Sequence, residues 1–291
     1  MVNGSRFFET FEARRLRSAA SLSMTSGADT VVMWKDSSGF YRFGPSVGVT
    51  YYWDANGQNP TTTPSGSIYK FSSAYTGFTF NMGSGNDKFT IDSSVGVTTG
   101  LTFSLYGYGG NDTLWGGDGA DYIDGGVGSD SLVGASGNDN ILGNDDGDTI
   151  DASAGDDTVS GGGGFDLLLG GKGNDSIDGD SGEDEIYGGD GNDTISGGDD
   201  TDTLYGENGN DTVDTGDYGT SNAGGTAYGG SGDDLLYGNF YSVLIGNIGS
   251  DHLTGEQLGV GINTRGYGNA PGAGDDGSPD YASKLGYYSE S

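Results

Sequence analysis

The chain has 291 residues, of which 61 are Gly, and its 43 acidic residues outnumber 11 basic ones, giving a formal net charge of -32. Hydrophobic residues make up 32% of the chain, too few for the single large core of an ordinary α/β enzyme of this length. The acidic surface excludes nucleic acid and anionic lipid as expected partners. The absence of Cys excludes disulfides and thiolate metal sites, and no apolar run reaches the ~20 residues of a membrane span.

Residues 1–24 are the first predicted segment, a basic leader or arm. They carry Arg6, Arg14, Arg15 and Arg17, and they lack the apolar core of a cleaved secretory signal. The stretch 11–19, FEARRLRSA, resembles a short leader found on large bacterial surface proteins. A solvated amphipathic helix is the alternative interpretation, and both stay open.

Residues 25–106 are rich in aromatic side chains and form the second predicted segment. Apolar residues alternate at Phe78, Phe80 and Met82, and again from Leu101 to Leu105, which is the period of two that is typical of strands. We therefore expect an irregular all-β segment. It should cover the first coil of the repetitive region that follows, because a bare coil edge is a template for aggregation.

Residues 107–254 repeat with a period of nine. An Asp stands at every ninth position from Asp112 to Asp211, and a branched aliphatic residue follows each of them two positions later. Gly stands five positions before each Asp, with Ala152 as the one exception. The unit is clearest at Gly188–Ser196, which reads GGDGNDTIS. A repeat of this kind is the sequence signature of a solenoid.

This nonapeptide unit is similar to the RTX, or haemolysin-type, calcium-binding repeat. The resemblance covers residues 107–214 without a break and resumes at Asp234 and Asp251, while Asp29 and Asp87 lie in isolated upstream copies. It implies an all-β fold, a right-handed parallel β-roll with 18-residue coils whose turns bind Ca²⁺. The upstream copies imply that the solenoid continues irregularly into residues 25–106.

The residue types explain the same architecture physically. Three residues centred on the aliphatic position form a short strand whose central side chain points inward. The six residues before it must reverse the chain, and Gly permits the positive φ values and close backbone contacts that this requires. Two nonapeptides then complete one coil, so the aspartates of alternate repeats fall into two columns.

Stacked carboxylates repel one another strongly in a low-dielectric environment. A Ca²⁺ ion between successive turns relieves that repulsion, because Ca²⁺ accepts six to eight oxygen ligands in a tolerant geometry. Turn carbonyls can complete its shell, whereas Mg²⁺ and Zn²⁺ fit this donor set less well. We expect about ten or more ions. The predicted metal ligands are Asp87, Asp112, Asp121, Asp130, Asp139, Asp148, Asp157, Asp166, Asp175, Asp184, Asp193, Asp202, Asp211, Asp234 and Asp251.

The ninth position of alternate repeats predicts two unlike outer faces. One face should carry an apolar stripe: Trp115, Val133, Asp151, Leu169, Tyr187, Tyr205 and Tyr228. The other should carry a polar row: Asp124, Leu142, Ser160, Asp178, Ser196 and Asp214. The stripe is expected to pack against flanking segments of its own chain or against a neighbouring molecule.

The sequence gives no evidence of a catalytic site. His252 is the only histidine and occupies a variable repeat position, and no catalytic triad or metalloprotease motif stands out. We therefore expect a non-enzyme with no catalytic residue and no cofactor other than Ca²⁺. Residues 255–291 form a tail rich in Gly, Tyr and Asp, and we expect either an uncleaved secretion signal, as RTX proteins typically carry, or a flexible end.

Three functional hypotheses remain. The first is a secreted structural protein that folds on Ca²⁺ outside the cell and builds a surface layer, filament or matrix through self-association or other cell-surface proteins. The second is a calcium-dependent adhesin that binds carbohydrate or ice. Ice binding requires regular ladders of Thr and Asn, and the residues at the fifth repeat position are too mixed in type to form such a ladder. The third is the secretion module of an exported protein.

Overall fold

The computed structural model describes residues 20–23, 30–35, 41–44, 69–71, 77–91, 101–216, 224–239, 241–255 and 281–282. All elements in these ranges are β-strands, and they form a parallel β-solenoid with about 8 coils of ~18 residues. The all-β prediction is therefore confirmed. Within the same ranges, no helix has the length and apolarity needed to cross a membrane.

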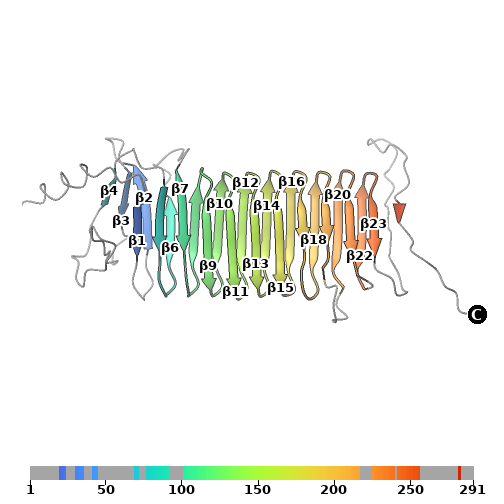
Figure 1. Ribbon diagram of the computed structural model, residues 1–291, viewed down its shortest axis with the longest axis horizontal. Helices are drawn as coiled ribbons and strands as arrows, with labels where there is room; N and C mark the ends of the chain where they lie inside the picture. The colour runs from blue at the N-terminus through green and yellow to red at the C-terminus, as the bar shows by residue number, and fades with distance from the viewer. Residues whose placement is uncertain are drawn as a thin grey trace, which may run out of the picture.

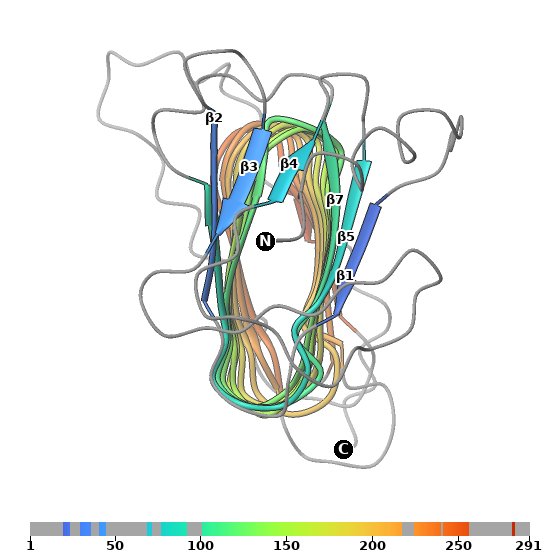
Figure 2. The same ribbon diagram turned by 90° about the vertical axis from the view of Figure 1, so that its left-hand side faces the viewer.

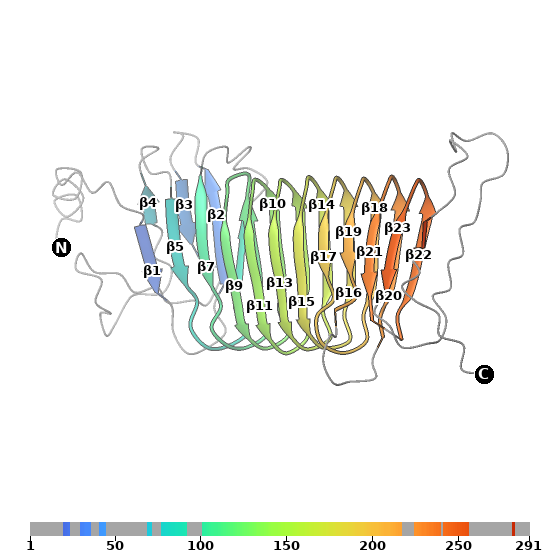
Figure 3. The same ribbon diagram turned by 45° about the vertical axis from the view of Figure 1, so that its right-hand side comes forward.

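Two parallel sheets face each other across the roll, and the chain alternates between them (Figures 1 and 3). Sheet I consists of β1 (Ala20–Ser23), β5 (Gly77–Asn81), β7 (Thr102–Tyr106), β9 (Tyr122–Val127), β11 (Asn140–Asp145), β13 (Thr158–Gly163), β15 (Ser176–Ser181), β17 (Thr194–Ser196), β19 (Thr212–Asp214), β21 (Leu235–Gly238), β23 (His252–Gly255) and β24 (Tyr281–Ala282).

Sheet II carries the other half of each coil. It consists of β4 (Tyr69–Phe71), β3 (Tyr41–Gly44), β2 (Thr30–Lys35), β6 (Lys88–Ile91), β8 (Thr113–Gly117), β10 (Ser131–Ser136), β12 (Thr149–Ala154), β14 (Leu167–Lys172), β16 (Glu185–Asp190), β18 (Thr203–Asn208), β20 (Thr226–Ser231) and β22 (Val243–Ile248).

The core lies between the sheets and is built from one aliphatic side chain per half-coil. The strand register places like residues on adjacent rungs, for example Leu132 beside Ile150 in sheet II and Ile141 beside Val159 in sheet I. These side chains are at most 2% exposed, as expected for the inward position of a strand. Because each coil buries so little apolar side chain, other interactions must help to hold the coils together.

Aromatic side chains fill the N-terminal end of the core. Phe80 and Phe89 lie 4.6 Å apart between ring centroids, and Phe103 packs 5.6 Å from Phe89. Here β2 and β6 extend sheet II in parallel, and β3 and β4 then add antiparallel strands. Figure 2 shows β3 and β4 lying across the upper part of this end of the roll. The described residues upstream of 106 thus continue the solenoid and cover part of its edge.

The C-terminal end also has an additional strand. The short strand β24 pairs in parallel with β23, with Tyr281 opposite His252 and Ala282 opposite Leu253. It therefore adds one more rung to sheet I. Of the predicted leader at residues 1–24, the structure describes only β1, which pairs with β5 in sheet I. Residues 256–280 and 283–291 of the tail lie outside the described residues.

Candidate metal centre

The chain turns between the two sheets at opposite edges of the roll (Figure 1). The predicted ligands lie in these turns and form one column along each edge. Column I precedes the strands of sheet I and contains Asp121, Asp139, Asp157, Asp175, Asp193, Asp211, Asp234 and Asp251. Column II precedes the strands of sheet II and contains Asp87, Asp112, Asp130, Asp148, Asp166, Asp184 and Asp202. All 15 side chains are at most 3% exposed.

At the fourteen positions from Asp112 to Asp251, one carboxylate oxygen accepts a hydrogen bond from the neighbouring coil. In the middle of column I, Asp175 Oδ1 accepts a hydrogen bond of 2.8 Å from the backbone N–H of Asp157, and Asp193 Oδ1 accepts one of 2.8 Å from the N–H of Asp175. Bonds of this kind measure 2.6–3.0 Å along both columns. They fix the orientation of these fourteen carboxylates.

The second oxygen has no hydrogen-bond donor at twelve of these positions, although it is fully buried. The twelve Oδ2 atoms belong to Asp112, Asp121, Asp130, Asp139, Asp148, Asp157, Asp166, Asp175, Asp184, Asp193, Asp211 and Asp234. A buried carboxylate oxygen without a partner costs about 1–3 kcal/mol of stability, and more when the carboxylate is charged. Such a regular series of buried anionic oxygens without donors is suited to binding cations in the turns.

Backbone carbonyls lie beside these oxygens. A Cβ placed on Gly170 would be 2.6 Å from Asp175 Oδ2 and 2.6 Å from the carbonyl oxygen of Gly188 on the next coil. The space that Gly leaves open is therefore lined by a carboxylate oxygen and a main-chain oxygen from two successive coils. Gly173, with φ of 125°, turns the chain on the same edge, which explains why the repeat demands Gly there.

Burial changes the acidity of the column aspartates. Desolvation raises the pKa of Asp121 to about 8 and that of Asp157 to about 7, because a buried carboxylate favours its neutral form. Neighbouring carboxylates, such as Asp139 beside each of them, raise these pKa values further, while hydrogen bonds from backbone N–H groups lower them. The columns thus hold negative charge at neutral pH only at an energetic cost.

The donor set fits Ca²⁺. Among the described residues, no three His, Asp or Glu side chains converge into a metal-binding cluster, so a cation in the turns must draw on carboxylates from successive coils together with main-chain carbonyls. An all-oxygen set of flexible geometry suits Ca²⁺, whereas Zn²⁺ prefers His and Cys. Asp175 and Asp193 would each contribute Oδ2 to such an ion, and Gly carbonyls would add to its shell.

The sequence pattern did not reveal how the columns end. Phe103 occupies the aspartate position before Asp121, and its backbone N–H donates to Asp121 Oδ1 at 2.6 Å. After Asp202, column II continues through Gly225 to Ser242, whose hydroxyl lies 2.7 Å from that of the buried Thr215. Phe103 thus ends column I on its N-terminal side, and the hydroxyl pair of Thr215 and Ser242 ends column II on its C-terminal side. Phe103 stands where the period would place Asp, and that was the available signal for column I; Gly225 and Ser242 are aligned with Asp202 only by the strand register.

The family comparison agrees with this geometry. The model of the RTX calcium-binding nonapeptide repeat (4 copies) matches residues 104–132, 133–168, 160–195, 187–217 and 222–240. The protein contains an RTX-type β-roll. The RTX roll is therefore a calcium-binding repeat structure, and its matched segments include most of both aspartate columns. A comparison with curated proteins finds no match.

The strand register of the RTX roll places the ninth-position residues in two rows, one on each sheet. On sheet II, the register aligns Trp115 with Val133 and, further along, Leu169 with Tyr187, so the stripe forms one row. Asp151 interrupts its apolar character between Val133 and Leu169. The matching row on sheet I is polar. Trp115 is 46% exposed at one end of the stripe.

Replacing a central ligand provides a direct test of the assignment. In Asp175→Asn, the side chain can still accept the Asp157 N–H bond but loses the anionic oxygen that two adjacent ions would share. We expect the free energy of unfolding at millimolar Ca²⁺ to fall by about 1–3 kcal/mol, since a site with Kd of ~10⁻⁴–10⁻³ M contributes about 0.4–1.4 kcal/mol. Urea denaturation followed by circular dichroism measures this change.

Asp190→Asn is the matched control for that variant. Asp190 is exposed and lies in a neighbouring turn, so its replacement removes the same charge without removing a buried ligand. Equal loss of stability in the two variants would contradict the assignment of Asp175 as a calcium ligand.

Proposed function

We propose that this protein is a secreted structural protein whose RTX roll folds when Ca²⁺ binds outside the cell, and that copies of it associate into a surface layer, filament or matrix. The observation that carries the proposal is the series of buried carboxylate oxygens without hydrogen-bond donors in both columns. The cytosol is poor in calcium, whereas sites of the extracellular type bind at 10⁻⁴–10⁻³ M. Synthesis in the cytosol would then keep the chain unfolded until export.

The ion count follows from the columns. The seven aspartates of column II enclose six gaps between coils, and the eight of column I enclose seven. One ion per gap gives a capacity slightly above our estimate of about ten from the repeats alone. The bound charge would offset most of the net charge of -32, which otherwise opposes both compaction and self-association.

The proposal of a structural role rests on what the chain contains. Most described residues belong to the roll or its N-terminal extension, and RTX repeats are calcium-binding structural units rather than catalytic ones. The apolar stripe and the polar row give the roll two chemically unlike faces. A rod with unlike faces and two distinct ends suits ordered assembly better than the capture of a small substrate.

A second candidate function, adhesion to an ordered polar surface, gains support from the fifth repeat position. That position is mixed in chain order, but the coils divide it into two columns. Above sheet I the exposed residues are Asn138, Asp156, Asn174, Asn192, Asn210 and Asp233. Their Oδ1 atoms accept bonds from the next coil's backbone N–H, at 2.8 Å between Asn174 N and Asp156 Oδ1. A rank of exposed Thr158, Ser176 and Thr194 lies alongside.

Electron microscopy separates the two functions. Protein dialysed into millimolar Ca²⁺ should form ordered fibres or sheets if its role is structural, and the same protein in chelator should not. Dispersed rods in Ca²⁺ would contradict the structural proposal. Retention of those rods on ice or on polysaccharide, reduced by replacing Asn174 and Asn192 with bulky residues, would then favour adhesion.

A further inference from the structure

Three tyrosines stand one above another on the outer face of sheet II. Tyr187, Tyr205 and Tyr228 occupy the ninth position of successive coils and are directly paired by the strand register of β16, β18 and β20. The ring centroids of Tyr187 and Tyr205 are 4.6 Å apart with an interplanar angle of 10°, and those of Tyr205 and Tyr228 are 4.9 Å apart at 5°. All three side chains are half-buried. We call this group the tyrosine stack.

A base adjoins one end of the tyrosine stack. The Tyr187 hydroxyl donates a 2.5 Å hydrogen bond to Glu185 Oε1, two residues earlier on the same strand. That bond, more than desolvation, raises the pKa of Tyr187 to about 12. The phenol therefore stays neutral at physiological pH, and a carboxylate is already placed to accept its proton when an electron leaves the ring.

We propose that the tyrosine stack is an oxidative cross-linking site, at which a one-electron oxidant of the peroxidase class joins neighbouring rings into dityrosine. Each of two phenols loses one electron to the oxidant and one proton, and at Tyr187 that proton passes to Glu185. The two phenoxyl radicals couple by forming a carbon–carbon bond between ortho ring positions. The two ortho hydrogens then move to the phenolic oxygens as the rings regain aromaticity, so two electrons and two protons leave in total.

Sheet II holds the tyrosine rings at a spacing and in a position that favour this coupling. Backbone pairing holds adjacent tyrosines one strand spacing apart, about 4.8 Å, so two radicals on neighbouring rungs meet without diffusion of the chain. The rings stand on an outer face, where rotation about χ2 can bring their ortho carbons together and a diffusible oxidant can reach them. By comparison, Tyr106 and Tyr122 on sheet I are 5.4 Å apart but tilted by 43°, and the Tyr122 hydroxyl lies 3.4 Å from Asp124.

A bond across Tyr205 would covalently join coils that are otherwise held by hydrogen bonds and calcium. The loop closed by a Tyr187–Tyr205 bond includes one complete coil, so cross-linking restricts the unfolded chain and favours the roll. The inference rests on the proposed function to the extent that calcium must first fold the roll and bring the rings together. The oxidised roll should then keep part of its β-structure when calcium is removed.

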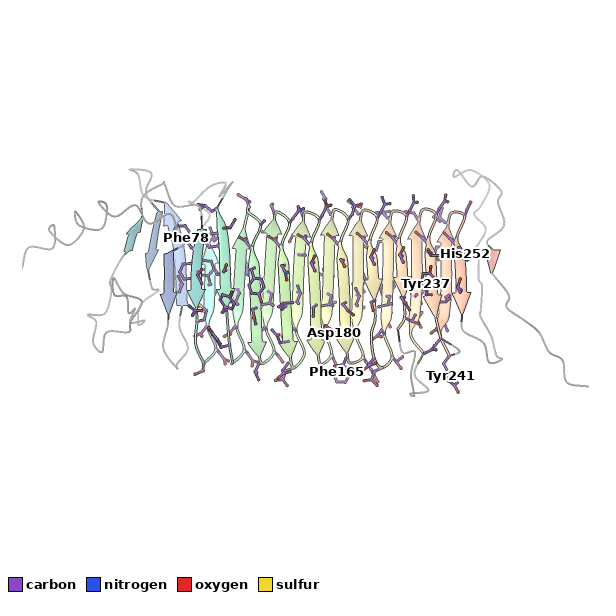
Figure 4. All side chains as sticks on the ribbon, in the orientation of Figure 1. Phe78, Phe165, Asp180, Tyr237, Tyr241 and His252 are labelled. Carbon is purple, nitrogen blue, oxygen red and sulfur yellow. The ribbon has the colours of Figure 1, made fainter. Side chains whose placement is uncertain are left out.

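The test compares two single substitutions in the full chain. Tyr205→Phe removes the central ring, which leaves Tyr187 and Tyr228 two rungs apart. Tyr237→Phe is the matched control, because Tyr237 (labelled in Figure 4) stands on sheet I between Asp214 and Thr254 and has no tyrosine on either rung. Dilute protein in millimolar Ca²⁺ is treated with peroxidase and hydrogen peroxide. Dityrosine fluorescence gives the yield, and mass spectrometry of the monomer band locates the linked peptides.

We expect Tyr205→Phe to lose most of the dityrosine yield, Tyr237→Phe to match the unchanged protein, and Glu185→Gln to slow the reaction at Tyr187. Equal yields from Tyr205→Phe and Tyr237→Phe, or links found only between molecules, would overturn the inference. Circular dichroism before oxidation keeps the two proposals apart: a roll that folds in Ca²⁺ and cross-links unselectively contradicts this inference alone, whereas a chain that stays unfolded in Ca²⁺ contradicts the proposed function.

Discussion

Removal of calcium at neutral pH is expected to unfold the RTX roll almost completely. Without a cation, the twelve buried Oδ2 atoms named above have no hydrogen-bond donor, and ionised carboxylates of adjacent coils repel one another through a medium of low dielectric. About ten ions at about 1 kcal/mol each would supply roughly 10 kcal/mol, which is comparable to the whole stability of a typical domain. The β-signal in circular dichroism should therefore collapse in excess chelator.

Magnesium serves as the control for that experiment. Added to the chelated protein at the same concentration, Mg²⁺ should restore little structure, because it demands near-octahedral geometry and gives up its water reluctantly, whereas Ca²⁺ should restore the roll. Full β-structure in chelator at pH 7.5 would show that the roll holds together without a cation, and the account of the columns would then be wrong.

Acid should partly replace calcium. In the folded chain, burial raises the pKa of Asp112 and Asp139 to about 6, of Asp148 to about 7 and of Asp121 to about 8, against 3.8 for an unperturbed group. Between pH 4 and 8 the folded state thus binds more protons than the unfolded state, so rising pH favours unfolding. The stabilisation is fully present below about pH 4 and is lost as pH rises through 6–8.

Circular dichroism of calcium-free protein across this range measures the effect. We expect more β-structure at pH 5 than at pH 8 in chelator, and the opposite trend for calcium affinity, because Ca²⁺ must displace those protons. Calorimetric titration in two buffers of different ionisation enthalpy should accordingly reveal proton release on Ca²⁺ binding near pH 7. A calcium-free chain whose structure increases from pH 5 to pH 8 would contradict the buried, raised-pKa state of the columns.

Most of the fold could be predicted from the nine-residue repeat. A strict period of nine, with Gly, Asp and an aliphatic residue in fixed places, predicts strand, turn and column together, and the structure places Asp112 and Asp130 on successive coils as expected. The fifth repeat position was harder to interpret from the sequence. Phe165 and Asn174 are the fifth residues of consecutive repeats but lie at opposite edges of the roll, so the regular column at each edge is not apparent along the chain.

Non-repetitive features could not be predicted in the same way. The antiparallel strands β3 and β4 and the short strand β24 depend on segments without internal periodicity, so no pattern fixed their partners. The closure of column II by Thr215 and Ser242 depends on the register after a longer connection, which nine-residue counting does not supply. In both cases the tertiary contact, rather than local sequence, selects the structure.

The hydrogen bonds of the columns give the rod a direction. Every one runs from a backbone N–H in an earlier coil to the carboxylate of a later coil, as from Asp139 to Asp157 and from Asp234 to Asp251. The backbone N–H at each column position of a coil is therefore hydrogen-bonded only when the next coil has folded. When the chain emerges N-terminus first, its last folded coil always has backbone N–H groups that await the next coil, so the rod grows in one direction. Shortening the chain from its C-terminal end exposes such N–H groups on a new last coil each time.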